Sequence, residues 1–373
     1  DFVCPSRGDY PFQWLWDSAF HAISLLHVNP GLAKREIVCL LQGAQSDGFV
    51  PHVLLWNKAG NKDALARYSI DLANPYATST TQPAVIARAI ERIYRQTKDD
   101  GFVRDVLPSV LGYFDWLGRF RDPDGDGLIA IIQPDESGMD ISPKFDLPLG
   151  LSGRGSLVTP EWKSAMERLF ATYAPHRAEP ATLPGLDAFQ VEEVLVNAIY
   201  GDGLRCLARL CRDIGASGAD ASKLDARATA VTRGLMAKCW DDETGVFWDA
   251  WGADEKPVRV LTVSALFPLI LEDLEPDIAR RLVTDHMLEP AEFWTRYPLP
   301  SVAADEPNFD PSFRSQAIWR GPTWVNTNWY LYWGLKTHGY DDIAGELATR
   351  TFDMVLRGGM REFFNPFTAE GYG

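Results

Sequence analysis

Apolar residues recur at helical spacing along most of this chain, and this periodicity limits the fold more than any other feature of the sequence. The stretches are 19–26, 33–41, 83–94, 103–120, 191–210, 226–239, 278–286, 323–335 and 343–356. Loops rich in Gly, Pro and Asp separate them and are alternately short and long. This pattern favours an all-α toroid of paired antiparallel helices, although periodicity alone does not show that such a toroid closes.

Local signals mark several element boundaries. Asn29-Pro30, Thr81-Gln82-Pro83 and Gly321-Pro322-Thr323 each have the residue types that begin helices. Strand signals are sparse, and the best short candidate is 245–251.

The composition limits domain organisation, partners and compartment. With no composition shift or flexible linker in 373 residues, we expect a single domain over 1–373 whose native ends are trimmed on one or both sides. The net charge is 36 − 51 = −15, which argues against electrostatic binding of nucleic acid or of an anionic membrane. No apolar run approaches the roughly 20 residues of a membrane span. Five scattered cysteines without a CxxC pair predict a reducing, cytoplasmic location and no zinc site.

The first unusual motif is YPFQWLWDSAFH at 10–21, in a chain with 13 Trp. Aromatic faces pack against the C–H face of a pyranose, and amides and carboxylates bind its hydroxyls. Gln13 and Asp17 would otherwise need buried partners. The alternative is a helix start that Asp17 or Ser18 caps.

The second motif, QPDESGMDISP at 133–143, places Asp135, Glu136 and Asp140 in one loop. Crowded carboxylates raise at least one pKa, as a general acid requires. A solvated acidic loop would have the same letters.

Two later motifs carry charges among aromatics. In WRGPTWVNTNW at 319–329, Trp319 and Trp324 flank Arg320, which either faces an acidic substrate group or packs by cation–π contact at a helix start. In REFFNPFT at 361–368, Glu362 adjoins two Phe, and Glu370 follows shortly after. A surface glutamate is the plainer interpretation of Glu362.

Together these motifs resemble the mannosylglycerate and glucosylglycerate hydrolases, relatives of processing α-glucosidase I in glycoside hydrolase family 63. The runs PFQWLWDSAFHAI, ESGMDISP, WRGPTWVNTNW and REFFNPFTAEGYG carry the resemblance from Tyr10 to Gly373, in the family's order. It implies an (α/α)6 barrel, a six-hairpin toroid with long loops around the active site. It also implies hydrolysis of an α-glycosidic bond with inversion.

The resemblance implies a role for each matching residue. Asp140 falls on the family's general acid and Glu362 on its general base, and inversion needs these carboxyls roughly 6.5–9.5 Å apart. Asp17 falls on a ligand of the sugar hydroxyls, and Glu370 is the second candidate for the base. The other expected substrate-binding residues are Tyr10, Trp14, Gln82, Glu136, Trp319, Arg320, Gly321 and Trp324.

The chain departs from the family at two positions and leaves other functions open. Ile141 and Ile318 stand where relatives often have Asn and Tyr, and Ile318 removes a hydroxyl from the glycerate side. A neutral α-gluco-oligosaccharide is therefore an alternative substrate, and a non-catalytic carbohydrate-binding toroid is an alternative function. A sugar epimerase would use His bases, yet the six His form no i,i+4 pair.

The expected partner is a small carbohydrate, with no cofactor and no metal. One run, 122–127, resembles the start of a calcium loop, but its twelfth position is Gln133 where that pattern has Glu. A D/G turn has the same letters.

Overall fold

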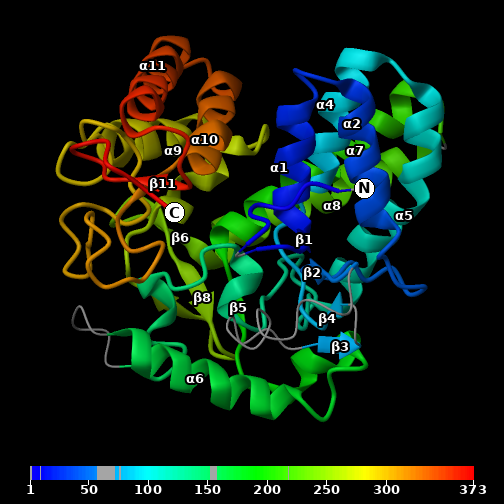
Figure 1. The fold of residues 1–373 in the computed structure, drawn as a ribbon, viewed down its shortest axis with the longest axis horizontal. Helices are drawn as coiled ribbons and strands as arrows, with labels where there is room; N and C mark the ends of the chain where they lie inside the picture. Colours follow the sequence, from blue (N-terminus) through cyan, green and yellow to red (C-terminus); the bar gives the residue numbers. More distant parts are fainter. Residues whose placement is uncertain (1, 9, 57–71, 75–76, 152–157, 217) are drawn as a thin grey trace. The chain divides into compact units, whose positions relative to one another are not determined.

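The computed structural model describes residues 2–8, 10–56, 72–74, 77–151, 158–216 and 218–373 (Figure 1). The chain divides into two compact units, each described by itself. Unit 1 comprises Asp1–Gly138, Glu167–Gln190 and Ile199–Val231. Unit 2 comprises Met139–Met166, Val191–Ala198 and Thr232–Gly373. The single domain expected from the sequence stays a prediction.

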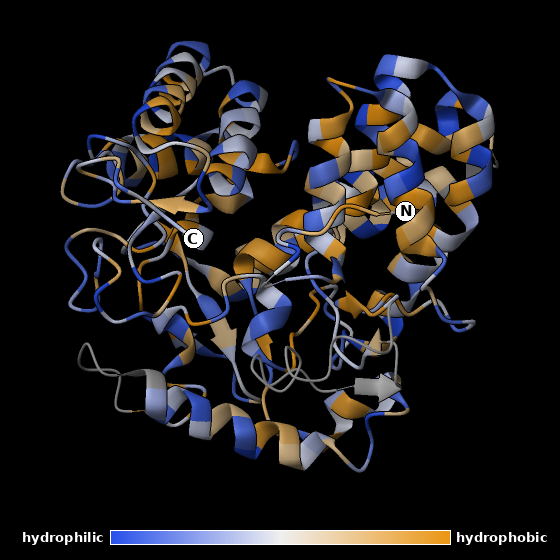
Figure 2. Cartoon of the chain, in the orientation of Figure 1, coloured by the Kyte–Doolittle hydropathy of each residue, from blue (hydrophilic) through white to orange (hydrophobic). Residues whose placement is uncertain are grey.

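Unit 1 is built on antiparallel helices that bury their apolar sides. Its helices are α1 (Leu15–Leu25), α2 (Pro30–Leu41), α4 (Ile86–Thr97) and α5 (Asp100–Phe120), with the 3-10 turns η1 (Pro134–Ser137) and η3 (Pro180–Leu186). Helix α1 packs on α2 and α4, and α5 packs on α2 and α4. Hydrophobic and hydrophilic residues alternate around these helices (Figure 2), so one side of each is buried.

Two of these helices begin at the cap residues that the sequence provides. The Asn29 side chain accepts hydrogen bonds from the backbone N–H groups of Gly31 and Leu32, and Pro30 occupies the first turn. Asp99 accepts from the N–H of Phe102 at the start of α5. The Asn29-Pro30 signal is therefore confirmed.

A small antiparallel sheet in unit 1 carries the first aromatic motif. Its strands are β1 (Gln13–Trp14), β2 (Val53–Leu54), β3 (Leu72–Asn74) and β4 (Ala77–Thr78), in the order β1-β2-β4-β3. Gln13 pairs with Leu54 and Trp14 with Val53. Helix α1 follows β1 directly, so this pairing fixes where the motif enters the helix.

Unit 2 combines helices with short strands. Its elements are η2 (Pro143–Phe145), β5 (Val191–Glu192), η4 (Leu235–Cys239), β6 (Trp240–Asp241), β7 (Val246–Phe247), β8 (Asp249–Trp251), β9 (Lys256–Val258), η5 (Val263–Ile270), α9 (Pro276–Arg281), η6 (Leu282–Met287), β10 (Thr323–Trp324), α10 (Val325–Thr337), α11 (Asp341–Gly358), β11 (Phe363–Phe364) and β12 (Gly371–Tyr372). Helix α10 packs on α11 and η5. The strands form the sheets β5-β8-β9, β6-β7 and β10-β11-β12.

Three further helices have residues in both units: α6 (Val158–Tyr173), α7 (Val194–Asp213) and α8 (Gly218–Gly234). The sequence predicts α7 and α8 but not α6. The stretches predicted at 226–239 and 278–286 end as π-helical turns, η4 and η6. The strand signal at 245–251 is confirmed as β7 and β8.

A buried group of charges joins α4 to α7 within unit 1. The Arg88 guanidinium binds both carboxylate oxygens of Asp202 and lies 3.2 Å from Glu91 Oε2. Arg209 Nε lies 2.7 Å from Glu91 Oε1. Burial raises the pKa of Glu91, but Arg209 and Arg88 outweigh burial and bring that pKa to about 2. Glu91 is therefore ionised at neutral and at mildly acidic pH.

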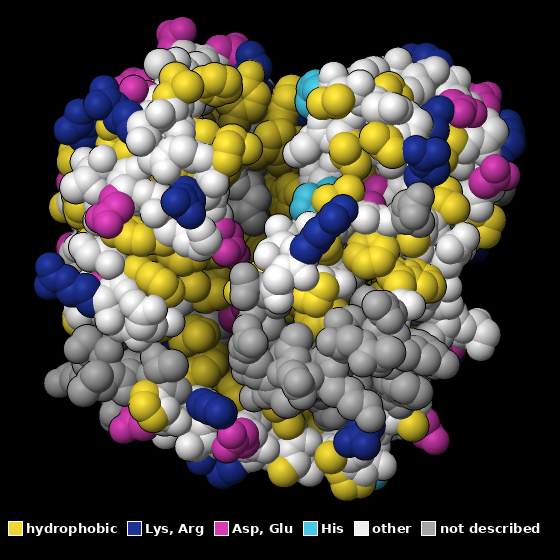
Figure 3. Space-filling view, in the orientation of Figure 1, with side chains coloured by type: hydrophobic (Ala, Val, Ile, Leu, Met, Phe, Trp, Pro, Cys, Tyr) yellow, Lys and Arg dark blue, Asp and Glu magenta, His cyan; other side chains and the backbone are white. Residues whose placement is uncertain are grey.

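On the viewed face in Figure 3, Lys and Arg side chains are interspersed with Asp and Glu. Within the described ranges, no helix combines the length and hydropathy needed to cross a bilayer.

Replacing Glu91 with Gln should lower thermal stability and change its dependence on pH. The variant leaves Arg209 without its buried anion, which costs about 3–5 kcal/mol at pH 7. Glu91 has a pKa below its unfolded value, so its contribution is complete above about pH 4.5 and is lost as pH falls through about 2. The melting temperatures of wild type and Glu91→Gln should therefore converge as pH falls over this range, as measured by circular dichroism.

The matched control is Asp115→Asn, which weakens the ion pair of Asp115 with Arg227 on exposed α5 surface. Such a pair contributes at most about 1 kcal/mol. Equal losses of melting temperature in the two variants at pH 7 would contradict the structural importance of Glu91.

Candidate active site

Asp140 lies directly after a turn that requires glycine. Gly138 ends η1 with φ +70°, and a Cβ there would lie 2.4 Å from a ring carbon of Trp16. The chain then turns again, since the N–H of Ser142 donates to the carbonyl of Met139 at 2.9 Å. Asp140 is half-buried between these two turns. Its backbone position is therefore fixed on both sides.

Glu362 lies at the start of the β11–β12 hairpin. Its backbone N–H donates to the carbonyl of Tyr372 at 3.0 Å. Strand β11 pairs on its other edge with β10, where Trp324 is opposite Phe363. A Cβ at Gly373 would lie 2.7 Å from Glu362 Oε2, so this glycine leaves the space beside the carboxylate open.

The two carboxyls influence one another electrostatically. Burial raises the pKa of Asp140, and the negative charge of Glu362 raises it further, to about 7. Although Glu362 is exposed, the surrounding chain desolvates its carboxylate enough to raise its pKa as well. Like charges close together disfavour double ionisation, so one proton is retained near neutral pH. This is the electrostatic state that an acid–base pair needs.

A buried ion pair links the segments that carry these carboxyls. Arg320 binds Asp146 through both terminal nitrogens, with Nη1 3.0 Å from Oδ2, and both side chains are almost inaccessible to solvent. Asp146 lies six residues after Asp140, and Arg320 precedes β10. The pairing weighs against the predicted role of Arg320 as a cation for the substrate, because its charge is already neutralised within the protein.

Aromatic rings stack beside Glu362. The Trp319 and Trp324 rings are parallel, with centroids 3.8 Å apart, and Phe363 stacks on Trp324 at 4.8 Å. Trp319 is 1% exposed and has φ +64°, a conformation that is strained for a bulky residue. Trp324 is also buried, and its Nε1 has no hydrogen-bond partner among the residues described. Trp324 thus keeps a hydrogen-bond donor that a ligand could use. Trp319 stacks on the Trp324 ring.

Unit 1 brings together the first group of predicted ligands. Tyr10 and Trp14 meet edge to face at 6.0 Å, and His52 lies 5.1 Å from the Trp14 ring. Trp14 is half-buried, and no described residue accepts from its Nε1. Burial lowers the pKa of His52 to about 3, so this neighbour is neutral. Asp17 lies half-buried in the first turn of α1.

Two other predicted ligands in unit 1 have structural partners. Gln82 is buried, and its Oε1 accepts from the N–H of Trp16 at 3.1 Å. Glu136 is 1% exposed and binds Arg121 at 2.6 and 2.7 Å. Glu136 also accepts from the backbone of Thr81 and Ile132. These bonds weigh against Glu136 as a substrate ligand, since both carboxylate oxygens are occupied.

The remaining predicted residues lie in unit 2. Gly321 donates its N–H to Ser301 Oγ at 2.9 Å, and a Cβ there would come within 2.7 Å of the Asp310 carbonyl carbon. Gly321 is therefore needed for close backbone packing. Glu370 is exposed and accepts from the Tyr372 hydroxyl at 3.2 Å.

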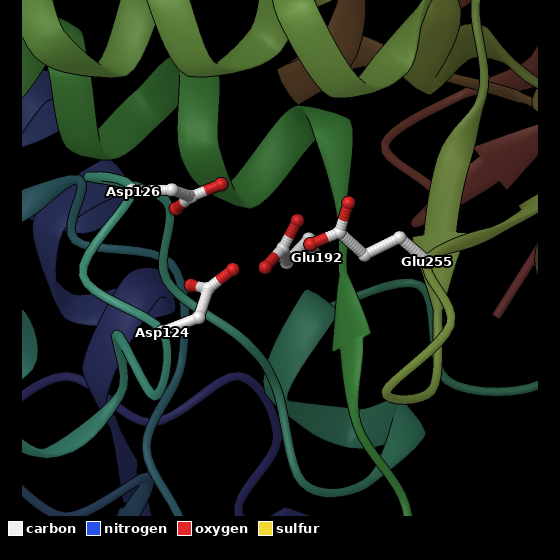
Figure 4. Close-up of side chains that lie close together, drawn as sticks. All are labelled: Asp124, Asp126, Glu192 and Glu255. Carbon is white, nitrogen blue, oxygen red and sulfur yellow. The ribbon is translucent and has the colours of Figure 1, made fainter.

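The loop that resembles a calcium site is shaped by its own hydrogen bonds. Asp122 accepts from the N–H groups of Gly125 and Gly127, and Asp126 accepts from that of Leu128. Figure 4 shows Asp124 and Asp126 of this unit 1 loop, with Glu192 on β5 and Glu255, which belong to unit 2. These hydrogen bonds are typical of a D/G turn.

Sequence reasoning missed the residues that support Asp140. Lys144 and Asp146 follow directly after the motif that contains it, and their partners Arg320, Glu193 and Asp249 come from distant segments. The sequence did contain an indication of this. Lys144 and Asp146 are charged residues within a mainly apolar stretch, and charged side chains that are buried need partners.

Comparison with known proteins identifies a family. Residues 10–373 match the model described as "Mannosylglycerate hydrolase MGH1-like glycoside hydrolase domain". The mannosylglycerate hydrolase of Thermus thermophilus is 32% identical over 100% of this chain and 93% of the relative. The glucosylglycerate hydrolase of Mycolicibacterium hassiacum is 27% identical over 98% of this chain and 89% of the relative.

A solved structure agrees with these matches. The family-63 mannosylglycerate hydrolase from Thermus thermophilus in complex with Tris and D-glycerate is 28% identical and covers 100% of this chain and 92% of that chain, with a TM-score of 0.87. The expected fold class, an all-α (α/α)6 toroid, is confirmed, and a small carbohydrate is the substrate class. The chain belongs to the mannosylglycerate hydrolase MGH1-like family of glycoside hydrolases.

Proposed function

We propose that this glycoside hydrolase cleaves the α-glycosidic bond of a glucosylglycerate or mannosylglycerate with inversion. In this mechanism, Asp140 is the general acid and Glu362 the general base. Asp140 donates its proton to the leaving glycosidic oxygen while Glu362 removes a proton from a water that attacks the opposite face of the anomeric carbon. The products are a free sugar and glycerate. Glu362 then releases its proton to solvent and Asp140 takes up a proton from solvent, which restores both groups.

The observation that carries the proposal is the unequal electrostatic environment of the two carboxyls. The pKa of Asp140 reaches about 7 because burial and the charge of Glu362 both raise it, so a large fraction of the protein keeps the Asp140 proton at neutral pH. Glu362 is more exposed and remains the better candidate for the ionised form. Two carboxyls in unequal environments, one of which keeps its proton more readily than the other, are the pattern of an acid–base pair in glycosidases.

The substrate class rests on the relatives. The similar proteins are named mannosylglycerate and glucosylglycerate hydrolases, and D-glycerate is bound in one similar structure. In unit 2, Trp324 offers a buried indole N–H that no described residue accepts, a donor suited to a sugar hydroxyl. In unit 1, the half-buried Trp14 offers ring surface and an indole N–H, the groups that bind a pyranose. Ile318 provides no hydroxyl for the glycerate side, and Arg320 is paired with Asp146. We therefore expect glycerate to be bound by other donors.

Replacing either carboxyl should remove one side of the pH profile. Asp140→Asn and Glu362→Gln should each lower kcat by about 10²–10⁴. In wild type, activity should fall as pH rises past about 7, because Asp140 loses its proton. It should also fall as pH drops through the raised pKa of Glu362, because the base becomes protonated. Initial rates between pH 4 and 9 on glucosylglycerate and mannosylglycerate measure both limbs.

Glu346→Gln is the matched control, since Glu346 is an exposed carboxylate on α11 that pairs with Arg350. This variant should keep the wild-type rate and profile. If Glu370→Gln removes the acidic limb and Glu362→Gln keeps it, Glu370 is the base instead.

The product anomer should be inverted. Hydrolysis of an α-glycoside followed by NMR at once should show the β-sugar first, because water attacks opposite the leaving group. Turnover should be compared for glucosylglycerate, mannosylglycerate and neutral α-disaccharides. Initial release of the α-anomer would overturn inversion, and faster turnover of a neutral disaccharide would overturn the glycerate assignment.

A further inference from the structure

Unit 2 contains a buried group of four side chains that contacts the residues on either side of Asp140. Lys144, Glu193, Asp249 and Ser264 form it, and each is at most 6% exposed. Lys144 comes from η2, Glu193 directly precedes α7, Asp249 comes from β8 and Ser264 from η5. We call it the Lys144 cluster. The proposed reaction assigns it no role.

The Lys144 ammonium has a partner for each of its protons. Nζ donates to Glu193 Oε1, lies 2.7 Å from Ser264 Oγ and lies 3.2 Å from Asp249 Oδ2. Three donors on three acceptors in fixed positions leave the ammonium no alternative geometry. Lys144 is therefore held from three different elements.

The two carboxylates are fixed in turn by the first turn of α7. Asp249 Oδ1 accepts from the N–H of Val194 at 2.8 Å, and Glu193 Oε2 accepts from that of Val196 at 2.5 Å. These N–H groups have no partner within the helix, so the carboxylates satisfy them. The cluster thus connects Lys144 to the start of a long helix, which is a rigid support.

The Lys144 cluster also contacts Met139, the residue that precedes Asp140. Ser264 Oγ lies 2.7 Å from Glu193 Oε1 and 3.2 Å from Met139 Sδ. The Ser264 hydroxyl has one proton, and it donates this proton in a hydrogen bond to the Glu193 carboxylate, which is the stronger acceptor. The Met139 sulfur therefore makes only a packing contact with the hydroxyl oxygen. Met139 immediately precedes Asp140, and Lys144 follows four residues later. Both ends of this short segment therefore contact one serine.

Stability alone is a poor explanation for the cluster. Burying one cation with two anions costs more in desolvation than an apolar group of equal volume would. Burial raises the pKa of Asp249 to about 6 even with Lys144 beside it. Without that ammonium, Glu193 and Asp249 would repel each other, and the Asp140 segment would lose its anchor.

We propose that Lys144 is a positioning residue for Asp140. The ammonium, held by Glu193, Asp249 and Ser264, fixes residues 139–144 so that the Asp140 carboxyl faces the leaving oxygen. This inference rests on the proposed role of Asp140 as general acid. Lys144 does not touch the substrate and acts only through the segment that it anchors.

The test compares substrates that differ in their need for an acid. A glycosylglycerate has a poor leaving group that must be protonated, whereas an α-glycosyl fluoride releases fluoride with little protonation. Lys144→Met keeps an unbranched side chain that is one atom shorter and removes its charge. It should lower kcat/KM for the glycosylglycerate about 10- to 100-fold and that for the fluoride by less than about 3-fold. The basic limb of the glycoside pH profile should also move.

Two variants keep the test informative. Glu91→Gln removes a buried ion-pair partner in unit 1 and should lower melting temperature without changing the ratio between the two substrates. Ser264→Ala removes one hydroxyl from the Lys144 cluster and should shift the ratio in the same direction as Lys144→Met, by a smaller factor. It serves in place of Lys144→Met if that variant does not fold.

The outcomes separate this inference from the proposed function. Equal losses on both substrates in Lys144→Met and Ser264→Ala, with a selective loss in Asp140→Asn, would overturn the inference alone. Equal losses on both substrates in Asp140→Asn would overturn the acid assignment and the inference with it. Selective losses in all three variants would support both.

Discussion

The ion pair between Asp146 and Arg320 connects most of the features that define the site in unit 2. Taking both charges out of water costs several kcal/mol per ion, and only close, doubled hydrogen bonds offset that cost. Burial raises the pKa of Asp146 and Arg320 opposes this, so the carboxylate depends on its partner. Loss of either residue would leave a buried unpaired charge, which would destabilise the contact between the segments that they join.

Those segments lead directly to the candidate acid and base. From Asp146 the chain runs back through η2 to Asp140. From Arg320 it runs forward into β10, which pairs with β11 next to Glu362. The stacked rings of Trp319, Trp324 and Phe363 cover this second path and limit water around it. Electrostatic interactions strengthen where water is excluded, so the aromatic stack and the ion pair support the same chemistry.

The sequence predicted the parts of the structure that local rules determine. Helical periodicity located α5 and α7, and Asn29-Pro30 marked the start of α2, because spacing and capping act within a few residues. Hydrophobic periodicity does not distinguish α-helical from π-helical turns, so it did not predict the π-helical turns that follow α8 and α9. Glu136 and Arg320 were predicted as ligands because a charged residue in a motif looks the same whether it binds substrate or a distant side chain. Only the fold shows that Arg121 and Asp146 are their partners.

The separation of Asp146 and Arg320 along the chain has a consequence for biosynthesis. The two residues are 174 positions apart, so their contact closes a long loop and carries the entropic cost of that closure. A nascent chain that has not yet emerged beyond Arg320 has the Asp140 motif but no cation to neutralise Asp146. During translation, the candidate site therefore becomes complete only after the segments that carry Arg320 and Glu362 have left the ribosome.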